Sequence, residues 1–377
     1  MNRLTRKARW LGALAASGAL LLAGTGAAAA APAGPDPSVR QSAAPDTVAL
    51  GGHLEHLTVT SDGARGYAVV SFAGPRGGMV RVVRSLDVRT GATADLLTLT
   101  GFDIVSRPAV SPDGTRVYLT VGGDLVTIDT ATGQETARVA APDQPRPEGF
   151  TAGVLHGVTV SADGARAYID QYGSWGRRAS EAGRVLAYDT ASRTFTGATE
   201  LTGYVVDTVV LGPDGTDAWA GTQDSLYHLD VRGAAPVVID AVAGFGAGDE
   251  VAPTPDGRAV YARGHQDATG TVDTVDPTAN TYRPAFTAAP SWDDAHLLGV
   301  SPDSARVYVL TDVKTPRAAL RVYDTATGTA VPGETVTDFG LPSVTDAFLG
   351  QDGHTLYLTS GTGVDSVLKT VRFRAGS

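Results

Sequence analysis

One turn sequence occurs seven times along this chain, and its spacing constrains the fold more than any other feature. The clearest copy runs from Ser111 to Thr120 as SPDGTRVYLT. Each copy centres on an aspartate and carries an aromatic residue five positions later. The aspartates are Asp62, Asp113, Asp163, Asp214, Asp256, Asp303 and Asp352, and the aromatic residues are Tyr67, Tyr118, Tyr168, Trp219, Tyr261, Tyr308 and Tyr357. Spacings of 42 to 51 residues predict a repeat architecture in which every copy forms one structural unit.

Within a unit, short strands alternate with tight turns, as the second copy illustrates. We expect strands over residues 104–110, 116–121, 125–128 and 135–139. The Ser-Pro-Asp-Gly segment forms a turn because proline fixes φ, glycine supplies a positive φ, and the aspartate side chain accepts hydrogen bonds from the turn backbone. Four strands in about 50 residues match one blade of a β-propeller. The sequence therefore predicts an all-β, seven-bladed β-propeller of four-stranded antiparallel blades.

The two ends of the repeat region complement each other. The last copy has strands near residues 355–359 and 367–373 but no fourth strand, whereas residues 47–50 resemble a fourth strand without a blade. We expect residues 47–50 to complete the last blade and close the ring, which leaves no open sheet edge between the first and last copies. The alternative is that they belong to the preceding linker.

The N-terminal segment has the features of a secretory signal. Four basic side chains occur in the first nine residues, residues 11–23 are apolar, and small residues follow through residue 31. We interpret residues 1–31 as a Sec-type signal peptide, residues 32–46 as a flexible Pro/Ala/Ser-rich linker, and residues 47–377 as the propeller domain. The mature protein is then secreted and has no integral membrane span. A retained N-terminal anchor is the alternative, but the apolar run is short for a transmembrane helix.

The composition limits the classes of partner. The chain has no cysteine, so neither disulfide bonds nor thiolate chemistry is available. Without residues 1–31, 26 basic residues stand against 40 acidic residues, a formal charge of −14. A surface this acidic disfavours nucleic acids, whose affinity depends on Lys and Arg contacts with phosphates. We expect a monomer whose partner is a protein, a glycan or a small molecule.

The repeat resembles a known family. SPDGTRVYLT followed by LVTIDTATG is similar to the YVTN-type, WD40-like propeller repeats of secreted and cell-surface bacterial proteins, over residues 47–373. The resemblance implies a propeller fold; the family includes binding and surface proteins, and related seven-bladed folds include lactonases and streptogramin lyases. The sequence departs from the family pattern after the tyrosine, for example at Ile169-Asp170-Gln171. The tryptophan that pyrroloquinoline-quinone propellers carry after the Asp-Thr-Ala-Thr-Gly turn is missing, so we expect no cofactor.

A row of polar residues precedes the repeated turns. Every copy has a polar side chain seven residues before its aspartate, and seven-fold geometry would gather this row around the central channel. Four of the seven histidines also lie on or just before these first strands. The candidate ligand-binding residues at the channel mouth are Glu55, His56, Arg107, His156, Asp207, Asp249, Glu250, His296 and Asp346.

Three interpretations of this polar row stay open. The side chains face ordered water in an open channel, or they bind a ligand, or the histidines and carboxylates hold a divalent cation or act as general acid and base. No local metal-binding motif decides between these, because the residues come from different copies. The Asp-Gly pairs of the turns lack the further acidic ligands of calcium loops, so we interpret them as turns.

Two insertions add aromatic and basic residues to the loops. The connection between the second and third strands and the link between units should emerge on the same face as the polar row. The third copy carries Trp175, Arg177 and Arg178 in such a connection, and Trp292 lies in the link into the sixth copy. Tryptophan and arginine are enriched at binding hot spots, and loops on a rigid scaffold often carry recognition. The alternative is that each tryptophan covers the edge of a neighbouring blade.

The sequence contains no motif of a known catalytic class, neither Gly-x-Ser-x-Gly, nor His-Glu-x-x-His, nor a phosphate-binding loop. We therefore expect a binding or interaction module, not an enzyme, with its ligand or partner at the loop-rich face around the channel. The alternative is a hydrolase or lyase of the lactonase or streptogramin-lyase type that uses the row of histidines and acids. The repeated turns lie on the opposite face and are interpreted as architectural.

Overall fold

The computed structural model describes residues 47–74, 78–100, 103–245, 250–263, 269–291, 295–361 and 365–373. The predicted signal peptide and linker lie outside these ranges. Every regular element within them is a β-strand. No helix in this described part of the chain is long and apolar enough to cross a membrane.

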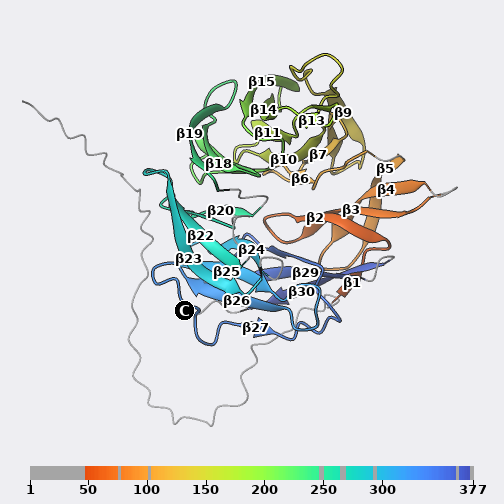
Figure 1. Ribbon diagram of the computed structural model, residues 1–377. Coiled ribbons are helices and arrows are strands. Elements are labelled where there is room, and N and C mark those ends of the chain that lie inside the picture. Colours follow the sequence, from red (N-terminus) through yellow and green to blue (C-terminus); the bar gives the residue numbers. More distant parts are fainter. Residues whose placement is uncertain are drawn as a thin grey trace, which may run out of the picture. The chain divides into compact units, whose positions relative to one another are not determined.

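Seven four-stranded antiparallel sheets succeed one another as the blades of a propeller, which confirms the predicted fold class (Figure 1). The first strand of each blade lies near the centre and the last lies at the rim. The first three blades are β2 (His53–Val59), β3 (Arg65–Ala73), β4 (Met79–Asp87) and β5 (Thr93–Thr100); β6 (Ala109–Val110), β7 (Arg116–Val121), β8 (Asp124–Asp129) and β9 (Glu135–Ala140); and β10 (Leu155–Val160), β11 (Arg166–Gln171), β14 (Gly183–Asp189) and β15 (Thr194–Leu201).

The remaining blades follow the same order, except that the last takes its fourth strand from the N-terminal side of the domain. Blades four and five are β16 (Val206–Leu211), β17 (Asp217–Thr222), β18 (Ser225–Asp230) and β19 (Val237–Ala243); and β20 (Val251–Pro253), β21 (Val260–Ala262), β22 (Gly270–Asp276) and β23 (Thr281–Ala289). Blades six and seven are β24 (Ala295–Val300), β25 (Arg306–Thr311), β26 (Ala319–Asp324) and β27 (Val336–Thr337); and β28 (Asp346–Leu349), β29 (Thr355–Gly361), β30 (Ser366–Arg372) and β1 (Thr47–Ala49).

The closing strand is present as predicted. β1 pairs antiparallel with β30, with Val48 opposite Leu368. Leu50, directly after β1, is fully buried and belongs to the cluster that joins blades seven and one. The ring is therefore closed by hydrogen bonds between the two ends of the domain.

The first strand of blade two is shorter than predicted. The sequence predicts a strand over residues 104–110, but β6 contains only Ala109 and Val110. Pro108 has no N–H to donate, so it interrupts the ladder with the second strand. Val105 still forms an isolated bridge with Val121. The other three strands of this blade lie within a residue of their predicted ranges.

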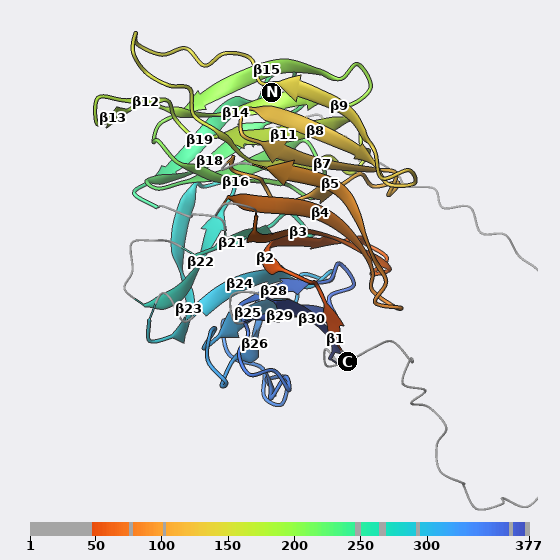
Figure 2. The ribbon, with the colours of Figure 1, turned by 90° about the vertical axis from the view of Figure 1, so that its right-hand side faces the viewer.

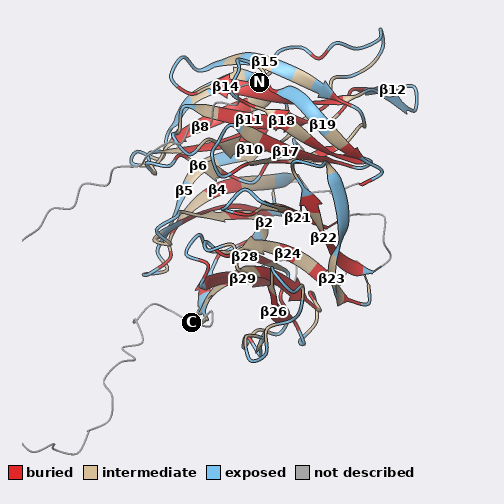
Figure 3. Ribbon diagram, turned by 90° about the vertical axis from the view of Figure 1, so that its left-hand side faces the viewer, coloured by how far each residue is buried: buried red, intermediate tan, exposed pale blue. Residues whose placement is uncertain are grey.

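The repeated aromatic residues form the interfaces between blades. None of the seven is more than 5% exposed, and each belongs to a separate apolar cluster with residues of the next blade. Trp219 of blade four, for example, packs with Val251 and Val260 of blade five. In Figure 3 the second and third strands are largely buried, whereas the rim strands β15 and β19 are exposed. This packing holds the blades at fixed positions and thereby fixes the two ends of the channel.

The repeated turns have the predicted construction. The Ser111 hydroxyl donates a 2.6 Å hydrogen bond to Asp113 Oδ1, and the Thr115 amide donates another of 3.0 Å. Gly114 adopts a φ of 70°, which a glycine tolerates without strain. The hydrogen bonds from Ser111 and Thr115 lower the pKa of Asp113 to about 2, so the carboxylate stays ionised at physiological pH. We call the face that carries these turns the turn face, and the opposite face the loop face.

Candidate functional site

Three residues of the polar row sit in β-bulges of the inner strands. The pairing of the first strand with the second skips Glu55 in β2, His156 in β10 and Asp207 in β16. A bulge redirects the side chain of its extra residue and is common next to functional sites. The row read from the sequence therefore coincides with a repeated backbone irregularity at the loop-face end of the channel.

Glu55 is engaged with an arginine of its own blade. Arg81 Nε donates a 2.6 Å hydrogen bond to Glu55 Oε2, and both side chains are less than one-fifth exposed. Another nitrogen of the same guanidinium donates to the carbonyl of Asp103, 3.0 Å away, in the next blade. Arg81 was not among the candidates from the sequence, because it lies on the third strand of the unit.

His56 lies near the positive charge of Arg107 from the next blade. Arg107 of blade two approaches Asp346 of blade seven to 3.9 Å, and its guanidinium lies 4.5 Å from the ring centroid of Phe348. Since blade one stands between those two blades, the pair passes across its inner edge. Burial and the positive charge of Arg107 lower the pKa of His56 to about 4. His56 is therefore neutral at physiological pH.

His156 is held by an acid that the sequence analysis did not select. Its Nδ1 lies 3.1 Å from Oδ2 of Asp170, which is 2% exposed. The imidazole stacks on Tyr172 with a centroid distance of 4.7 Å, and the Tyr172 hydroxyl donates to Asp207 Oδ1 at 3.4 Å. Burial, together with the charges of Asp207 and Asp170, raises the pKa of Tyr172 well above its usual value, so the hydroxyl remains a donor.

Glu250 connects the fifth and sixth blades. Its two oxygens accept hydrogen bonds of 2.5 Å from Arg263, whose side chain is 2% exposed. His296 Nδ1 lies 3.0 Å from Oε1, and the Leu297 amide donates to Oε2 at 2.7 Å. Burial alone would raise the pKa of Glu250, but the hydrogen bonds from His296 and Arg263 hold it below its usual value. Asp249, also a candidate, lies outside the described residues.

The loop-face ring is thus a set of separate charge pairs. Glu55 and Glu250 each accept from an arginine, and His156 and His296 each meet a carboxylate. In the part of the chain that the structure describes, no group of three or more histidines and acids is arranged to hold a metal ion. Chemically, these pairs fix the orientation of the ring residues, and the contact between His296 and Glu250 also joins blades five and six.

The insertion of blade three forms a small hairpin that projects from the loop face (Figure 2). Its strands are β12 (Trp175–Gly176) and β13 (Ala179–Ser180), joined by Arg177 and Arg178. Both arginines have positive φ, 46° and 65°, a conformation that costs a non-glycine residue about 1 kcal/mol. Trp175 is 55% exposed, so it does not cover a neighbouring blade. Trp292 lies outside the described residues.

A buried hydrogen-bond network supports this hairpin. Trp175 and Thr151 exchange backbone hydrogen bonds of 2.8 and 2.9 Å. Behind them, the 3%-exposed Arg184 donates to Gln171 Oε1 at 2.5 Å and also donates to the Pro142 carbonyl oxygen. A Cβ at Gly173 would lie 1.6 Å from the Glu181 carbonyl oxygen, so only glycine fits there. The hairpin is consequently built on a rigid base.

Two residues of this base carry a signal in the sequence. Asp170 and Gln171 occupy the positions where blade three departs from the family pattern, and both are 2% exposed. A polar pair in the middle of a buried strand indicates specific partners, because an unpaired buried polar group is costly. Arg184 gave no such signal, since arginine is ordinary at the start of a strand.

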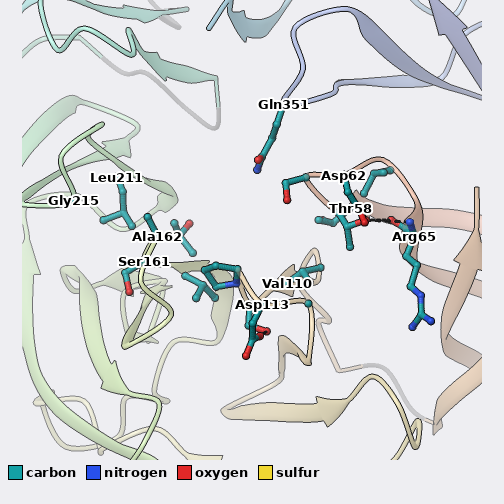
Figure 4. Close-up of a pocket in the computed structure, with 18 of the residues that line it drawn as sticks. Thr58, Asp62, Arg65, Val110, Asp113, Ser161, Ala162, Leu211, Gly215 and Gln351 are labelled. Atoms are coloured by element: carbon teal, nitrogen blue, oxygen red, sulfur yellow. Dashed lines mark hydrogen bonds between the residues drawn. The ribbon is translucent and has the colours of Figure 1, made fainter. Parts of the chain in front are cut away.

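The turn face, which the sequence predicts to be architectural, also carries cavities. One of about 870 Å³ is lined by the turns of blades one to four and by Gln351 of blade seven. Figure 4 shows Thr58, Val110, Ala162, Leu211 and Gln351 around it.

Comparisons with known proteins support the fold alone. No family model matches the chain, and no curated protein matches its sequence. A chain of the solved structure described as "Crystal Structure of Mitotic Checkpoint Complex" has a TM-score of 0.62 at 15% identity, covering 92% of this chain and 97% of its own length. A chain of "Kuenenia stuttgartiensis Hydrazine Synthase" has a TM-score of 0.56 at 15% identity, covering 84% and 94%. The YVTN-type, WD40-like family expected from the repeats is not confirmed.

Proposed function

We propose that the protein is a secreted β-propeller interaction module that binds its partner on the loop face, through the hairpin of blade three. The leader-like N-terminus supports secretion. Propellers commonly act as binding scaffolds, because loops that differ between blades are displayed on a rigid ring.

The observation that carries this proposal is the exposure of Trp175 on a supported hairpin. A tryptophan that is 55% exposed leaves a large apolar surface in water. The two adjacent arginines make no ion pair or hydrogen bond through their side chains with the described residues, and both adopt a strained backbone conformation. Strain of this kind persists where the surrounding structure imposes it, often at binding sites. Tryptophan and arginine are also the residues most enriched in hot spots.

The ring at the channel mouth gives less support to the hydrolase or lyase alternative. Glu55 and Glu250 are engaged by Arg81 and Arg263, and the low pKa of Glu250 disfavours a role as general acid. We therefore assign these pairs a structural role. The partner would cover the loop-face opening around them.

The proposal is tested by comparing two exposed aromatic residues. Purified mature protein is immobilised and exposed to the surface and secreted fractions of the cells that produce it, with Trp175→Ala and Phe72→Ala as variants. Phe72 is 37% exposed in blade one and serves as the matched control. We expect Trp175→Ala to weaken retention of a discrete partner about 30-fold, a typical hot-spot loss, and Phe72→Ala to leave it unchanged. Equal retention by both variants would contradict the proposal.

A further inference from the structure

The turn-face end of the channel has an apolar cavity beside an acidic one. The apolar cavity, of about 540 Å³, is lined by Leu211, Pro213, Pro253, Pro255, Val300, Pro302 and Gln351, none of them charged. The acidic cavity, of about 440 Å³, is lined by Pro213, Asp214, Asp217, Pro255, Asp256 and Gly257. The two cavities share Pro213 and Pro255, so a ligand in one directly adjoins the other.

The apolar lining recurs around the channel because it follows the repeat. Four copies place a proline directly before the turn aspartate, and six copies place a valine, leucine or proline three residues before it in the lining of the cavities. The 870 Å³ cavity continues this surface through blades one to three and shares Leu211 and Gln351 with the apolar cavity. These volumes lie in the range of ligand-binding sites.

The threonine hydroxyls at this end of the channel have partners within the protein. Thr58 and Thr159 each donate a 2.6 Å hydrogen bond to a carbonyl oxygen of the next blade. Thr254 donates to the carboxylate of Asp256 at 2.6 Å. The Gln351 amide makes no hydrogen bond with the described residues. The apolar cavity of about 540 Å³ therefore offers apolar contacts and the Gln351 amide.

The adjoining cavity is negatively charged. Asp214 and Asp256 both accept hydrogen bonds from their own turns, and these bonds lower the pKa of each carboxyl group. Two of its carboxylates have partners beyond their own turns: Asp256 meets Arg258 at 3.6 Å, with the Arg258 side chain 86% exposed, and Asp217 Oδ2 lies 2.8 Å from His228 Nε2. Other arginines of the turn face reach away from the channel: Arg166 donates to the Val231 carbonyl oxygen, and Arg306 donates to Asp324. Arg65 lines the 870 Å³ cavity, but Figure 4 shows its guanidinium pointing away from Gln351.

From this arrangement we propose a second binding site, at the turn-face end of the channel between blades four and six. Its occupant is an extended segment of a partner protein that places a bulky apolar side chain against Pro213, Pro255 and Pro302 and an adjacent lysine or arginine in the acidic cavity. The site lies on the face opposite the blade-three hairpin and is independent of the function proposed above.

The test uses a synthetic probe peptide, fluorescein-labelled Gly-Trp-Arg-Gly-Trp-Arg-Gly, measured by fluorescence polarisation against the purified mature protein. Asp214→Asn/Asp256→Asn keeps an oxygen acceptor for each turn but removes both charges, and we expect it to weaken binding about tenfold. Pro213→Ala/Pro255→Ala should also weaken it, and alanine is compatible with this turn because Ala162 occupies the same position in blade three. Asp129→Asn, a turn aspartate away from the channel, is the matched control and should change nothing.

The outcome also separates alternative occupants. Binding should fall with added salt and should be lost when glutamate replaces arginine, or alanine replaces tryptophan, in the peptide. Equal affinity for the glutamate peptide, or full affinity in the double asparagine variant with an unchanged melting temperature, overturns the proposal. Concentration-dependent self-association that Trp175→Ala abolishes also overturns it, because a second copy of this chain would then occupy the site through its own hairpin.

Discussion

The loop face and the turn face of this propeller are made from the same seven repeats but differ in how they use charge. On the turn face, each aspartate is satisfied by its own turn, as Asp113 is by Ser111 and Thr115. On the loop face, charges meet partners from elsewhere, as Glu250 meets Arg263 and His296. Because the hydrogen bonds of the turn face are local, every blade can use the same turn sequence. The loop-face pairs join residues further apart, so each blade can differ, and the loop face is where specificity can develop.

The largest expected effect comes from breaking a buried loop-face pair. Glu250→Gln should destabilise the protein by about 3–5 kcal/mol, because it removes the negative charge that pairs with Arg263, whose side chain is 2% exposed. Glu55→Gln, whose partner Arg81 is 16% exposed, should cost clearly less. Urea denaturation at pH 7 measures both variants. Equal losses would mean that burial does not distinguish the two pairs.

The next effect is the pH dependence that His56 gives to the free energy of unfolding. Because the pKa of His56 in the folded protein is about 4, below the ordinary value of about 6.5, the unfolded chain binds more protons between these pH values. The free energy of unfolding should therefore fall by about 2 kcal/mol from this residue as the pH drops from 7 to 5.

Two variants isolate this contribution. His56→Gln should flatten the dependence of stability on pH between 7 and 5, whereas His354→Gln, at an exposed position on the turn face, should not. A pH profile of His56→Gln that parallels the wild type would show that His56 is not the group responsible.

Smaller effects are expected from the hydroxyl groups of the repeated tyrosines between the blades. The Tyr168 hydroxyl donates a 3.0 Å hydrogen bond to the Val231 carbonyl oxygen beside a turn of the next blade, whereas the equivalent hydroxyl of Tyr308 is buried with no partner among the described residues. Tyr168→Phe should cost about 1 kcal/mol, and Tyr308→Phe should be neutral or slightly stabilising. Thermal unfolding compares the two, and the opposite order would indicate that the hydrogen bond contributes nothing.

The smallest effect concerns the blade-three hairpin. Arg177→Asn/Arg178→Gly introduces the residues that a two-residue hairpin turn with positive φ prefers. It should leave the melting temperature unchanged or slightly higher, because removal of the backbone strain raises the free energy of unfolding by at most about 1–2 kcal/mol. Partner binding should be lost with the two charges. A destabilised variant would contradict the account of strain at this turn.

The repeat made the turn face predictable, because each turn depends only on residues next to it in sequence. The closing strand followed from counting strands at the two ends of the domain. The pairs of the loop face were harder to predict. Arg81 lies on the third strand of its blade and Arg263 directly after the second, and the sequence alone does not place Asp170 beside His156. The bulges at Glu55, His156 and Asp207 have no local sequence signature. The sequence does not indicate the apolar cavity of the turn face, because the prolines that line it are also the residues that a tight turn requires.

Site-specific photo-crosslinking tests the central claim, recognition through the blade-three hairpin on the loop face, most directly. A photoreactive amino acid is placed at Ala179, exposed in the hairpin that carries Trp175, or at Ile239, 55% exposed on the rim strand β19 of blade four, and the protein is irradiated with the cells that produce it. Our account predicts a discrete crosslinked partner from position 179 that disappears in the Arg177→Asn/Arg178→Gly background, and none from position 239. A partner captured from position 239 but not from position 179 would contradict it.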